Sequence, residues 1–380
     1  MKIALITHGR VNPDGNNGVA RTVYNLNLFL NQAGIETEIL AFDDRQKQPE
    51  IYRRDEHTTI HLFPRAHYFR GTEMADYIRK NKFDLLHFHL MWMLDKNELL
   101  RSLHNTVPYV ITAHGAYSAN LTTSFKKRLS LHSLEGNFLK QAAMIHALCH
   151  EEKCHLREQQ HCRRPICVIP NGINDDERIL IRQARSHTAD PYDHSYLNVA
   201  MIARLRPDKN VLGMIHMLDY LPADIRQKLR LNLVGDGVEP YWSQVKSLAA
   251  QPQYRSNVIL HGPKYGEEKY AYISNADIYL QPSFSEGISF SILDAMACGA
   301  AMILSRQTNM THYYNENFYL MTETYPEDIA SAVTQLARSP EYRKQLGEKA
   351  EAMTREAFAW KKLVSLYIKM YQDALEQSKK

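Results

Sequence analysis

Residues 281–303 read QPSFSEGISFSILDAMACGAAMI, and this stretch predicts the fold of the second half of the chain. A short apolar strand ends near Pro282, Glu286-Gly287 turns the chain, and a helix begins around Ser289. An apolar run at 301–304 follows and has the composition of a second strand. A helix between two strands returns the chain to the same edge of a sheet, so the two strands pair in parallel.

The same alternation of short apolar runs and amphipathic stretches extends along the chain in both directions. In the second half we expect strands at 198–202, 231–234, 258–260, 278–281 and 301–304. In the first half we expect a helix at 18–32 and strands at 3–7, 38–42, 60–63, 85–89, 109–113, 144–148 and 167–169. Two such series in tandem predict an α/β protein with two Rossmann-like, doubly wound parallel sheets.

The domain boundaries follow from a break in this pattern. Between Asn174 and Tyr196 the periodicity gives way to a charged stretch that is expected to be a helix followed by a linker. We therefore expect an N-terminal domain at 1–175, a linker at 176–196 and a C-terminal domain at 197–360. Past Tyr325 the pattern is helical, and we expect the last helix, about 361–380, to pack back on the N-terminal domain.

Composition excludes several classes of protein. The 380 residues are 44% hydrophobic and 23% charged, which is ordinary for a globular chain of two domains. The formal charge is only +4, and no basic run or aromatic-basic interleaving indicates a nucleic-acid partner. The first ten residues contain too short an apolar run for a signal peptide, and no run approaches a membrane span. We expect a cytoplasmic protein.

Two groups of residues raise the question of a metal site. Four of the five cysteines, Cys149, Cys154, Cys162 and Cys167, lie close together in sequence with histidines between them, but their spacing lacks the short Cys-x2-Cys clips of structural zinc sites. Buried cysteines acting as small hydrophobic residues are the favoured reading. His87 and His89 form an H-x-H pair. A role in packing or in contact with the acceptor substrate is favoured over metal binding, because the sequence shows no third metal ligand.

Two loops have the residues of an anion site. HGRVNPDGNNGVARTV follows the first strand, and its glycines, among them Gly18, suit either a ligand that approaches the backbone before a helix or simply a flexible turn from strand to helix. Neither a dinucleotide fingerprint nor a Walker loop is present. ARLRPDKNV follows the first strand of the second half and contains Arg204 and Lys209. The planar guanidinium of Arg204 and the compact ammonium of Lys209 together suit a diphosphate.

The segment 281–303 adds two carboxylates to these cations. Glu286 precedes the expected helix and Asp294 lies inside it, and carboxylates accept hydrogen bonds from sugar hydroxyls. The structural alternative makes Glu286 a helix-cap partner and Asp294 a buried polar group without a partner, which would be costly. The helix start also exposes the amides of Ile288, Ser289 and Phe290.

Taken together, these motifs resemble the retaining glycosyltransferases of family four, which have the GT-B fold of two Rossmann-like domains facing across a cleft. The resemblance covers nearly the whole chain. It rests on the Asn17-Gly18 loop, PYVITAHGAYS around His114, VIPNGIN at 168–174, ARLRPDKN at 203–210, LNLVGDG at 231–237, NVILHGP at 257–263, NADIYLQPSFSEG at 275–287, LDAMACG at 293–299, and the late RSPEYRKQLGEKA and FAW segments.

The resemblance implies a nucleotide diphosphate sugar as donor substrate. Arg204 and Lys209 would bind the diphosphate, assisted by the Gly18 amide, and Glu286 would bind hydroxyls of the transferred sugar. His114 would contact the sugar near its reacting carbon. The remaining donor contacts would come from Asp294 at the ribose, from Gly262, Pro263 and Lys264 beside the base, and from Gly287, Ile288, Ser289 and Phe290 at sugar and phosphate.

Two features depart from the family pattern. Asp294 stands where the family usually has Glu, which shortens its reach by one methylene, and the segment 305–320 lacks the usual Gly-Gly turn. The resemblance also implies retention of anomeric configuration, with the leaving phosphate taking the acceptor proton. No two aspartates are separated by one residue, so the D-x-D metal motif is absent and we expect no metal or other cofactor.

The acceptor is the least defined part of the prediction. Phe125, Lys126, Lys127 and Arg128 suit a helix resting on an anionic membrane, or equally a solvated basic face. On the first reading the acceptor is a lipid-linked saccharide of a bacterial envelope polymer, and the protein lies at the inner face of the cytoplasmic membrane. Two rival functions are a nucleotide-sugar epimerase of similar architecture and a non-catalytic sugar-nucleotide-binding subunit.

Overall fold

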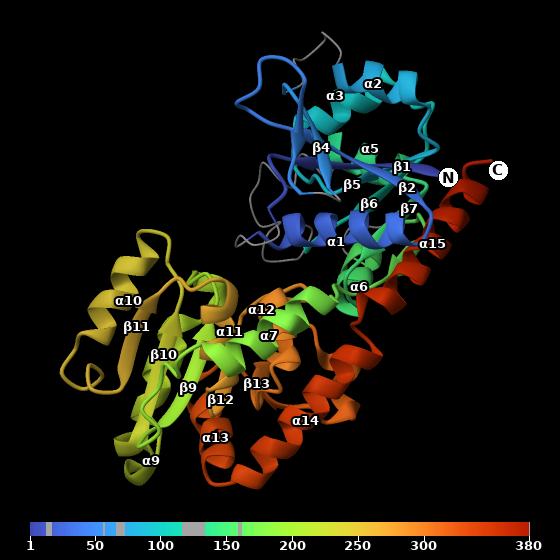
Figure 1. Ribbon diagram of the computed structural model, residues 1–380. Helices are drawn as coiled ribbons and strands as arrows, with labels where there is room; N and C mark the ends of the chain where they lie inside the picture. The colour runs from blue at the N-terminus through green and yellow to red at the C-terminus, as the bar shows by residue number, and fades with distance from the viewer. Residues whose placement is uncertain (13–16, 56–57, 66–72, 116–133, 159–161, 380) are drawn as a thin grey trace. The chain divides into compact units, whose positions relative to one another are not determined.

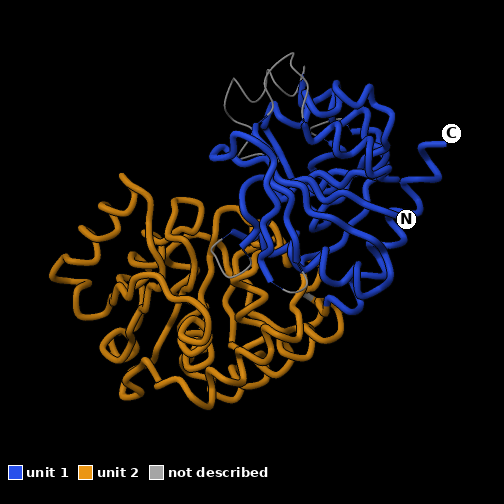
Figure 2. Tube along the Cα trace, turned by 45° about the horizontal axis from the view of Figure 1, so that its top comes forward, with its two compact units in different colours: residues 1–171, 360–380 blue, residues 172–359 orange. Residues whose placement is uncertain are grey.

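The computed structural model describes residues 1–12, 17–55, 58–65, 73–115, 134–158 and 162–379 (Figure 1). The chain divides into two compact units (Figure 2). Unit 1 comprises Met1–Asn171 and Trp360–Lys380, and unit 2 comprises Gly172–Ala359. Each unit contains one sheet covered by helices, so the predicted α/β fold with two parallel-sheet domains is confirmed.

The sheet of unit 1 has the strand order β3-β4-β2-β1-β5-β6-β7-β8. All neighbours are parallel except β3 and β4. The strands are β1 (Lys2–His8), β2 (Glu36–Phe42), β3 (Glu50–Arg53), β4 (Thr59–Phe63), β5 (Leu85–Phe88), β6 (Tyr109–Thr112), β7 (Met144–Ala147) and β8 (Ile166–Val168). The sequence did not predict β3, because this short edge strand is largely exposed and therefore has no apolar run.

Alternate residues of the central strands pack on opposite faces of this sheet, as the period of a β-strand requires. Ile3 and Leu5 of β1 pack against α1 (Gly18–Gln32) and α15 (Trp360–Gln377). Ala4 and Ile6 point into the core under the other helices, α2 (Glu73–Asn81), α3 (Leu94–Ser102), α5 (Leu134–Gln141) and α6 (His150–Glu158). The C-terminal helix thus belongs to unit 1, where the Trp360 ring stacks on Phe29 of α1 at 5.8 Å between centroids.

The sheet of unit 2 is wholly parallel, with the order β11-β10-β9-β12-β13-β14. Its strands are β9 (Leu197–Ile202), β10 (Leu229–Val234), β11 (Val258–Gly262), β12 (Ile278–Gln281), β13 (Met302–Ser305) and β14 (Tyr319–Thr322). The sequence predicted the first five and missed β14. Its burial pattern has two half-buried residues in the middle, so it lacks the continuous apolar run of the inner strands.

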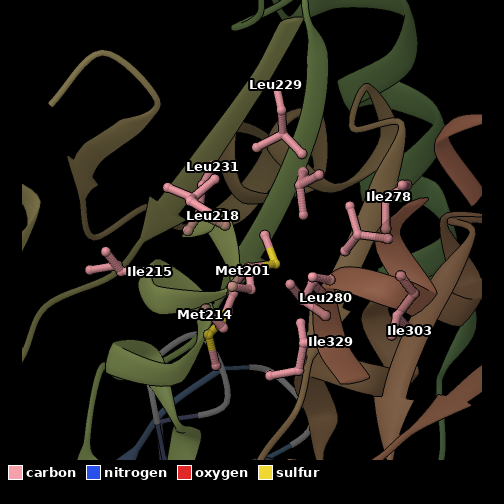
Figure 3. Packing of buried hydrophobic residues seen from close by; sticks show 14 of the residues in the cluster. Met201, Met214, Ile215, Leu218, Leu229, Leu231, Ile278, Leu280, Ile303 and Ile329 are labelled. Carbon is pink, nitrogen blue, oxygen red and sulfur yellow. The ribbon is translucent and has the colours of Figure 1, made fainter. Parts of the chain in front are cut away.

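The helices of unit 2 are α7 (Asp175–His187), α8 (Val211–His216), α9 (Ala223–Lys228), α10 (Tyr241–Ala249), α11 (Gly266–Ser274), α12 (Phe290–Ala297), α13 (Pro326–Ala337) and α14 (Pro340–Glu356). Short 3-10 turns lie at Pro207–Lys209, Met217–Asp219, Arg306–Thr308 and Thr311–Glu316. On one face of the sheet, Met201 of β9 and Leu280 of β12 pack against Met214 of α8 and Ile329 of α13 (Figure 3).

The segment 176–196, expected as a helix followed by a linker, begins with α7, which extends to His187. Asn174 and Glu177 form a capping box at the start of α7, in which each side chain accepts a hydrogen bond from the other residue's backbone N–H. Ile181 and Ala184 are buried, and the contact division assigns the helix to unit 2. Among the described residues, no helix combines the length and apolar character needed to cross a membrane.

Candidate functional site

The strand order of unit 2 reverses between β9 and β12. The chain runs outward from β9 through β10 to β11, then returns to place β12 on the other side of β9. At such a reversal the loops after the two strands turn in opposite directions and leave a crevice at their carboxyl ends, where open α/β sheets bind ligands. These two loops contain Arg204, Lys209 and Glu286, which the sequence singled out.

The loop after β9 presents the two cations differently. Arg204 is exposed and forms no ion pair or hydrogen bond with the described residues. Lys209 ends a 3-10 turn and is only 8% exposed. Asn210 follows with a left-handed backbone, φ 58°, and donates hydrogen bonds to the carbonyls of Pro282 (3.2 Å) and Thr324 (2.8 Å). Asn210 thereby fixes this loop to the segments after β12 and β14.

Glu286 lies at the centre of a hydrogen-bond network. Its Oε1 accepts from the Lys209 ammonium, from Gln281 Nε2 at 2.6 Å and from Ser283 Oγ at 2.8 Å. The side chains of Lys209 and Glu286 are 10% and 7% exposed, so this ion pair is largely shielded from water. Within the described residues Oε2 accepts no hydrogen bond. The network therefore fixes the carboxylate through one oxygen and leaves the other without a hydrogen-bond partner among the described residues.

The helix that follows, α12, begins one residue later than predicted, at Phe290. Ser289 is its N-cap residue but makes no capping hydrogen bond, and its Oγ lies 2.7 Å from Ser291 Oγ. Ser291 in turn donates to Gln281 Oε1 at 2.9 Å, which links the helix start to the Glu286 network. The first turn contains no acidic residue, so the positive end of the helix dipole is available to an anion.

Asp294 lies one turn inside α12 and is 3% exposed. It is not a buried polar group without a partner, which was the structural alternative considered from the sequence. Its Oδ2 accepts from Lys269 Nζ at 2.9 Å and its Oδ1 from Tyr270 OH at 3.4 Å, both on α11. Gly262 ends β11 with φ 70°, and Pro263 after it is exposed. Lys264 forms an ion pair with Glu268.

In unit 1 the strand order reverses between β1 and β5; of the residues predicted in this unit, Gly18 begins the helix after β1 and His114 follows β6. Gly18 is exposed at the start of α1, where Asn17 Oδ1 accepts from the Val19 amide at 3.1 Å. His114 follows β6 with a left-handed backbone, φ 49°, and Gly115 continues the turn at φ 74°.

Two side chains hold the His114-Gly115 turn. His89 Nδ1 lies 2.9 Å from His114 Nε2, and Glu152 accepts from the Gly115 amide at 2.6 Å. Burial lowers the pKa of His114 to about 3. His114 is therefore neutral near pH 7 and offers a hydrogen bond rather than a positive charge.

A second histidine network lies beneath this turn, and one carbonyl fixes the direction of every hydrogen bond in it. His146 Nε2 donates to the Ile169 carbonyl at 2.8 Å, so its Nδ1 must accept from Thr112 Oγ1, also at 2.8 Å. Thr112 then accepts from His87 Nε2 at 2.6 Å, which leaves His87 Nδ1 to accept from Tyr371 OH at 2.8 Å. Hydrogen bonds thus account for both ring nitrogens of His87, whereas His89 contacts His114 through Nδ1 and has a buried Nε2 without a hydrogen bond among the described residues.

Several site residues could not have been singled out from sequence. Gln281 and Ser283 are ordinary strand-end residues until the turn folds Glu286 back over them, and Lys269 resembles any charged residue on a helix surface. Asn210 gave a weak signal, because Asn tolerates the left-handed backbone better than most residues. The spacing of Gln281 and Ser283 before Glu286 is present in the sequence, but it does not indicate hydrogen bonds between them until the shape of the turn is known.

The cysteines are all unpaired, and Cys149, Cys162 and Cys298 are buried. Burial raises the pKa of the Cys149 and Cys162 thiols, as expected for small apolar residues. In the part of the chain that the structure describes, no three His, Cys, Asp or Glu side chains are grouped to hold a metal ion. Phe125, Lys126, Lys127 and Arg128, expected at a membrane, lie outside the described residues.

Comparison with known proteins agrees with this geometry. The model of the glycosyl transferases group 1 family matches residues 188–353, and that of Glycosyltransferase Family 4 matches residues 16–177. The N-acetyl-alpha-D-glucosaminyl L-malate synthase of Bacillus anthracis is 23% identical over 352 residues, which are 90% of this chain and 89% of that enzyme.

Solved structures of low sequence identity share the fold over nearly all of their length. Sucrose-phosphate synthase from Thermosynechococcus elongatus matches with a TM-score of 0.79 at 18% identity, covering 98% of both chains. HepE of Anabaena, in complex with UDP and glucose, matches with a TM-score of 0.74 at 13% identity, covering 98% of this chain and 99% of that one. The chain belongs to the family-four glycosyltransferases and is a glycosyltransferase of the GT-B fold.

Proposed function

We propose that this enzyme transfers a sugar from a nucleotide diphosphate sugar to a saccharide or lipid-linked acceptor, with retention of configuration and without a metal ion. The observation that carries the proposal is the Lys209-Glu286 pair at the strand-order reversal of unit 2. It sets a cation for a diphosphate next to a carboxylate oxygen for sugar hydroxyls. A donor that contains both groups fits this arrangement.

The leaving group defines what the cations do. As the bond between sugar and phosphate breaks, negative charge grows on the diphosphate, and fixed positive groups stabilise that charge most in the transition state. Arg204 supplies a full positive charge, Lys209 supplies an ammonium whose charge Glu286 partly offsets, and the start of α12 adds the partial charge of a helix N-terminus. These groups replace the divalent ion that metal-dependent transferases use.

The carboxylate orients the sugar. Glu286 Oε1 is fully engaged by its three donors, so Oε2 accepts from the hydroxyls of the transferred sugar. A hydrogen bond to a charged group contributes about 1.5 to 3 kcal/mol, enough to fix the ring relative to the diphosphate.

No protein base is needed for the acceptor proton, which passes to the departing phosphate oxygen on the same face. His114, with a pKa of about 3, contributes a neutral hydrogen bond to the sugar rather than a proton.

The donor and acceptor are proposed as classes. UDP is bound in the structure of HepE, which supports a nucleoside diphosphate at this site, with UDP- and GDP-sugars as the first candidates. A role in bacterial envelope polysaccharide or glycolipid synthesis follows if the acceptor is lipid-linked.

The test uses labelled UDP- and GDP-sugars with a panel of simple sugars and lipid-linked saccharides. We expect transfer, or slow hydrolysis to free sugar and nucleoside diphosphate, that persists in EDTA and gives a product with the anomeric configuration of the donor. Glu286→Gln should abolish turnover, whereas Lys344→Met, which changes an exposed lysine of α14, should not.

Other outcomes point to other functions. An epimerised nucleotide sugar would identify an epimerase, and nucleotide binding without turnover on any acceptor would favour the non-catalytic reading. If EDTA abolished activity and added Mg²⁺ restored it, only the proposed metal independence would be contradicted, and the proposed sugar transfer would stand.

A further inference from the structure

The ion pair between α11 and α12 changes what the site offers to a nucleotide. Asp294, the carboxylate assigned to the ribose by resemblance, already accepts from Lys269 Nζ at 2.9 Å and from Tyr270 OH at 3.4 Å. Its side chain is 4% exposed, whereas that of Lys269 is 22% exposed. Lys269 is therefore the more accessible member of the pair.

The position of Lys269 is fixed by its neighbours. Its ammonium lies over the Tyr270 ring at 4.2 Å from the centroid, in addition to its bond with Asp294. Lys269 is the fourth residue of α11, about one helical turn from the carboxyl edge of the sheet, and Asp294 is one turn inside α12. Through its bond to Asp294, the ammonium thus lies about one helical turn from the N-terminus of α12.

We propose that Lys269 binds the ribose of the donor and that Asp294 is the positioning residue that holds it there. The inference rests on the proposed function and deepens it. An ammonium has three N–H donors, and Asp294 takes one of them. The others are available to the 2′- and 3′-hydroxyl oxygens, which can accept hydrogen bonds as well as donate them.

The charge of the pair supports this assignment. A lone carboxylate close to a nucleoside diphosphate would repel its phosphates, whereas the Lys269-Asp294 pair is neutral as a unit. The shorter side chain of Asp294 then costs the site nothing, because Asp294 does not need to reach the ribose. A purely structural ion pair that joins α11 to α12 is the competing explanation, and it predicts no dependence on the ribose hydroxyls.

The first experiment measures dissociation constants by calorimetry for UDP and GDP and for their 2′-deoxy and 3′-deoxy analogues. A charge-assisted hydrogen bond of about 1.5 to 3 kcal/mol corresponds to a factor of about 10 to 150 in affinity. We expect removal of the contacted hydroxyl to weaken binding to the wild-type enzyme by about that factor. In Lys269→Met the penalty should shrink to about twofold, while the matched Lys344→Met retains it.

The outcomes separate the inference from the proposed function. If Lys269→Met lost as much affinity for the deoxy analogues as the wild-type enzyme does, Lys269 would have no role in binding the ribose. If only Asp294→Asn abolished this difference in affinity, Asp294 itself would be the residue that contacts the ribose. If the wild-type enzyme binds neither UDP nor GDP, the proposed function fails and the inference fails with it.

A second experiment uses only the wild-type enzyme, so its result does not depend on whether a variant folds. Lysine acetylation of the wild-type enzyme, read by mass spectrometry, should be blocked at Lys269 by the nucleotide that binds but not by pyrophosphate, which lacks a ribose. Lys209 should be protected by both ligands and Lys344 by neither. Equal acetylation of Lys269 with and without bound nucleotide would refute the contact.

Discussion

Replacing Lys209 by Met separates the stability of the site from its chemistry. The change removes the cation from a pair whose side chains are 10% and 7% exposed and leaves the Glu286 carboxylate without a counter-charge. Breaking a buried ion pair in this way costs about 3 to 5 kcal/mol. Glu286 keeps its hydrogen bonds from Gln281 and Ser283, so we expect the lower end, about 3 kcal/mol.

The expected shift is large enough to measure. For a domain of the size of unit 2, about 3 kcal/mol corresponds to a melting temperature lowered by roughly 6 to 12 °C, which scanning calorimetry resolves. The double variant Lys209→Met with Glu286→Gln removes both charges and should recover most of this loss. A double-mutant cycle then gives the coupling between the two side chains.

Nucleotide binding should follow a different pattern. Lys209→Met should weaken UDP or GDP binding by about 10- to 150-fold, the value of one charge-assisted contact, and the double variant should not recover it. Arg204→Met should weaken binding with almost no change in melting temperature, because Arg204 is exposed and has no partner among the described residues.

Two results would refute this reasoning. If Lys209→Met melted at the wild-type temperature, the ion pair would not stabilise the fold. If the double variant recovered nucleotide affinity together with stability, Lys209 would act only through the fold and would not contact the diphosphate.

Two further predictions concern the histidine network of unit 1. Tyr371→Phe removes the donor to His87 Nδ1 and leaves a buried acceptor unpaired, so chemical denaturation should show a free energy of unfolding lowered by about 1 to 3 kcal/mol. The control Tyr325→Phe, at a tyrosine that is 64% exposed, should leave this free energy unchanged. Burial lowers the pKa of His146 from the usual 6.5 to about 4, so the unfolded chain binds more protons than the folded chain between these pH values. The free energy of unfolding should therefore fall by up to about 3 kcal/mol from this residue as the pH drops from about 6.5 to 4, with no loss from it above pH 6.5. If urea titration gave a constant free energy of unfolding over that range, it would contradict the neutral, buried state of His146.

Local patterns in the sequence were sufficient to predict most of the fold. The inner strands of both sheets are continuous apolar runs, because parallel strands are covered by helices on both faces and must be apolar throughout. Such runs can be recognised without knowing the tertiary structure. The strands that were missed, β3 and β14, lie at sheet edges, where partial exposure removes that signal.

The sequence also identified the residues with the most distinctive chemistry. Arg204, Lys209 and Glu286 follow predicted strands, and the carboxyl ends of parallel strands share one edge of a sheet, so the location of these residues followed from element order alone. The pairing of Lys209 with Glu286, which are 77 residues apart in sequence, did not follow from it.

Only the tertiary structure decided which partners these residues have. The sequence determined that unit 2 has a cationic loop, a carboxylate and a helix start at one sheet edge, because secondary structure and strand order depend on local patterns. That Glu286 has one oxygen engaged, that Asp294 is neutralised by Lys269, and that His114 stays uncharged depends on which distant side chains lie within about 3 Å. Hydrogen bonds and desolvation act over such short distances, and only the folded chain sets them.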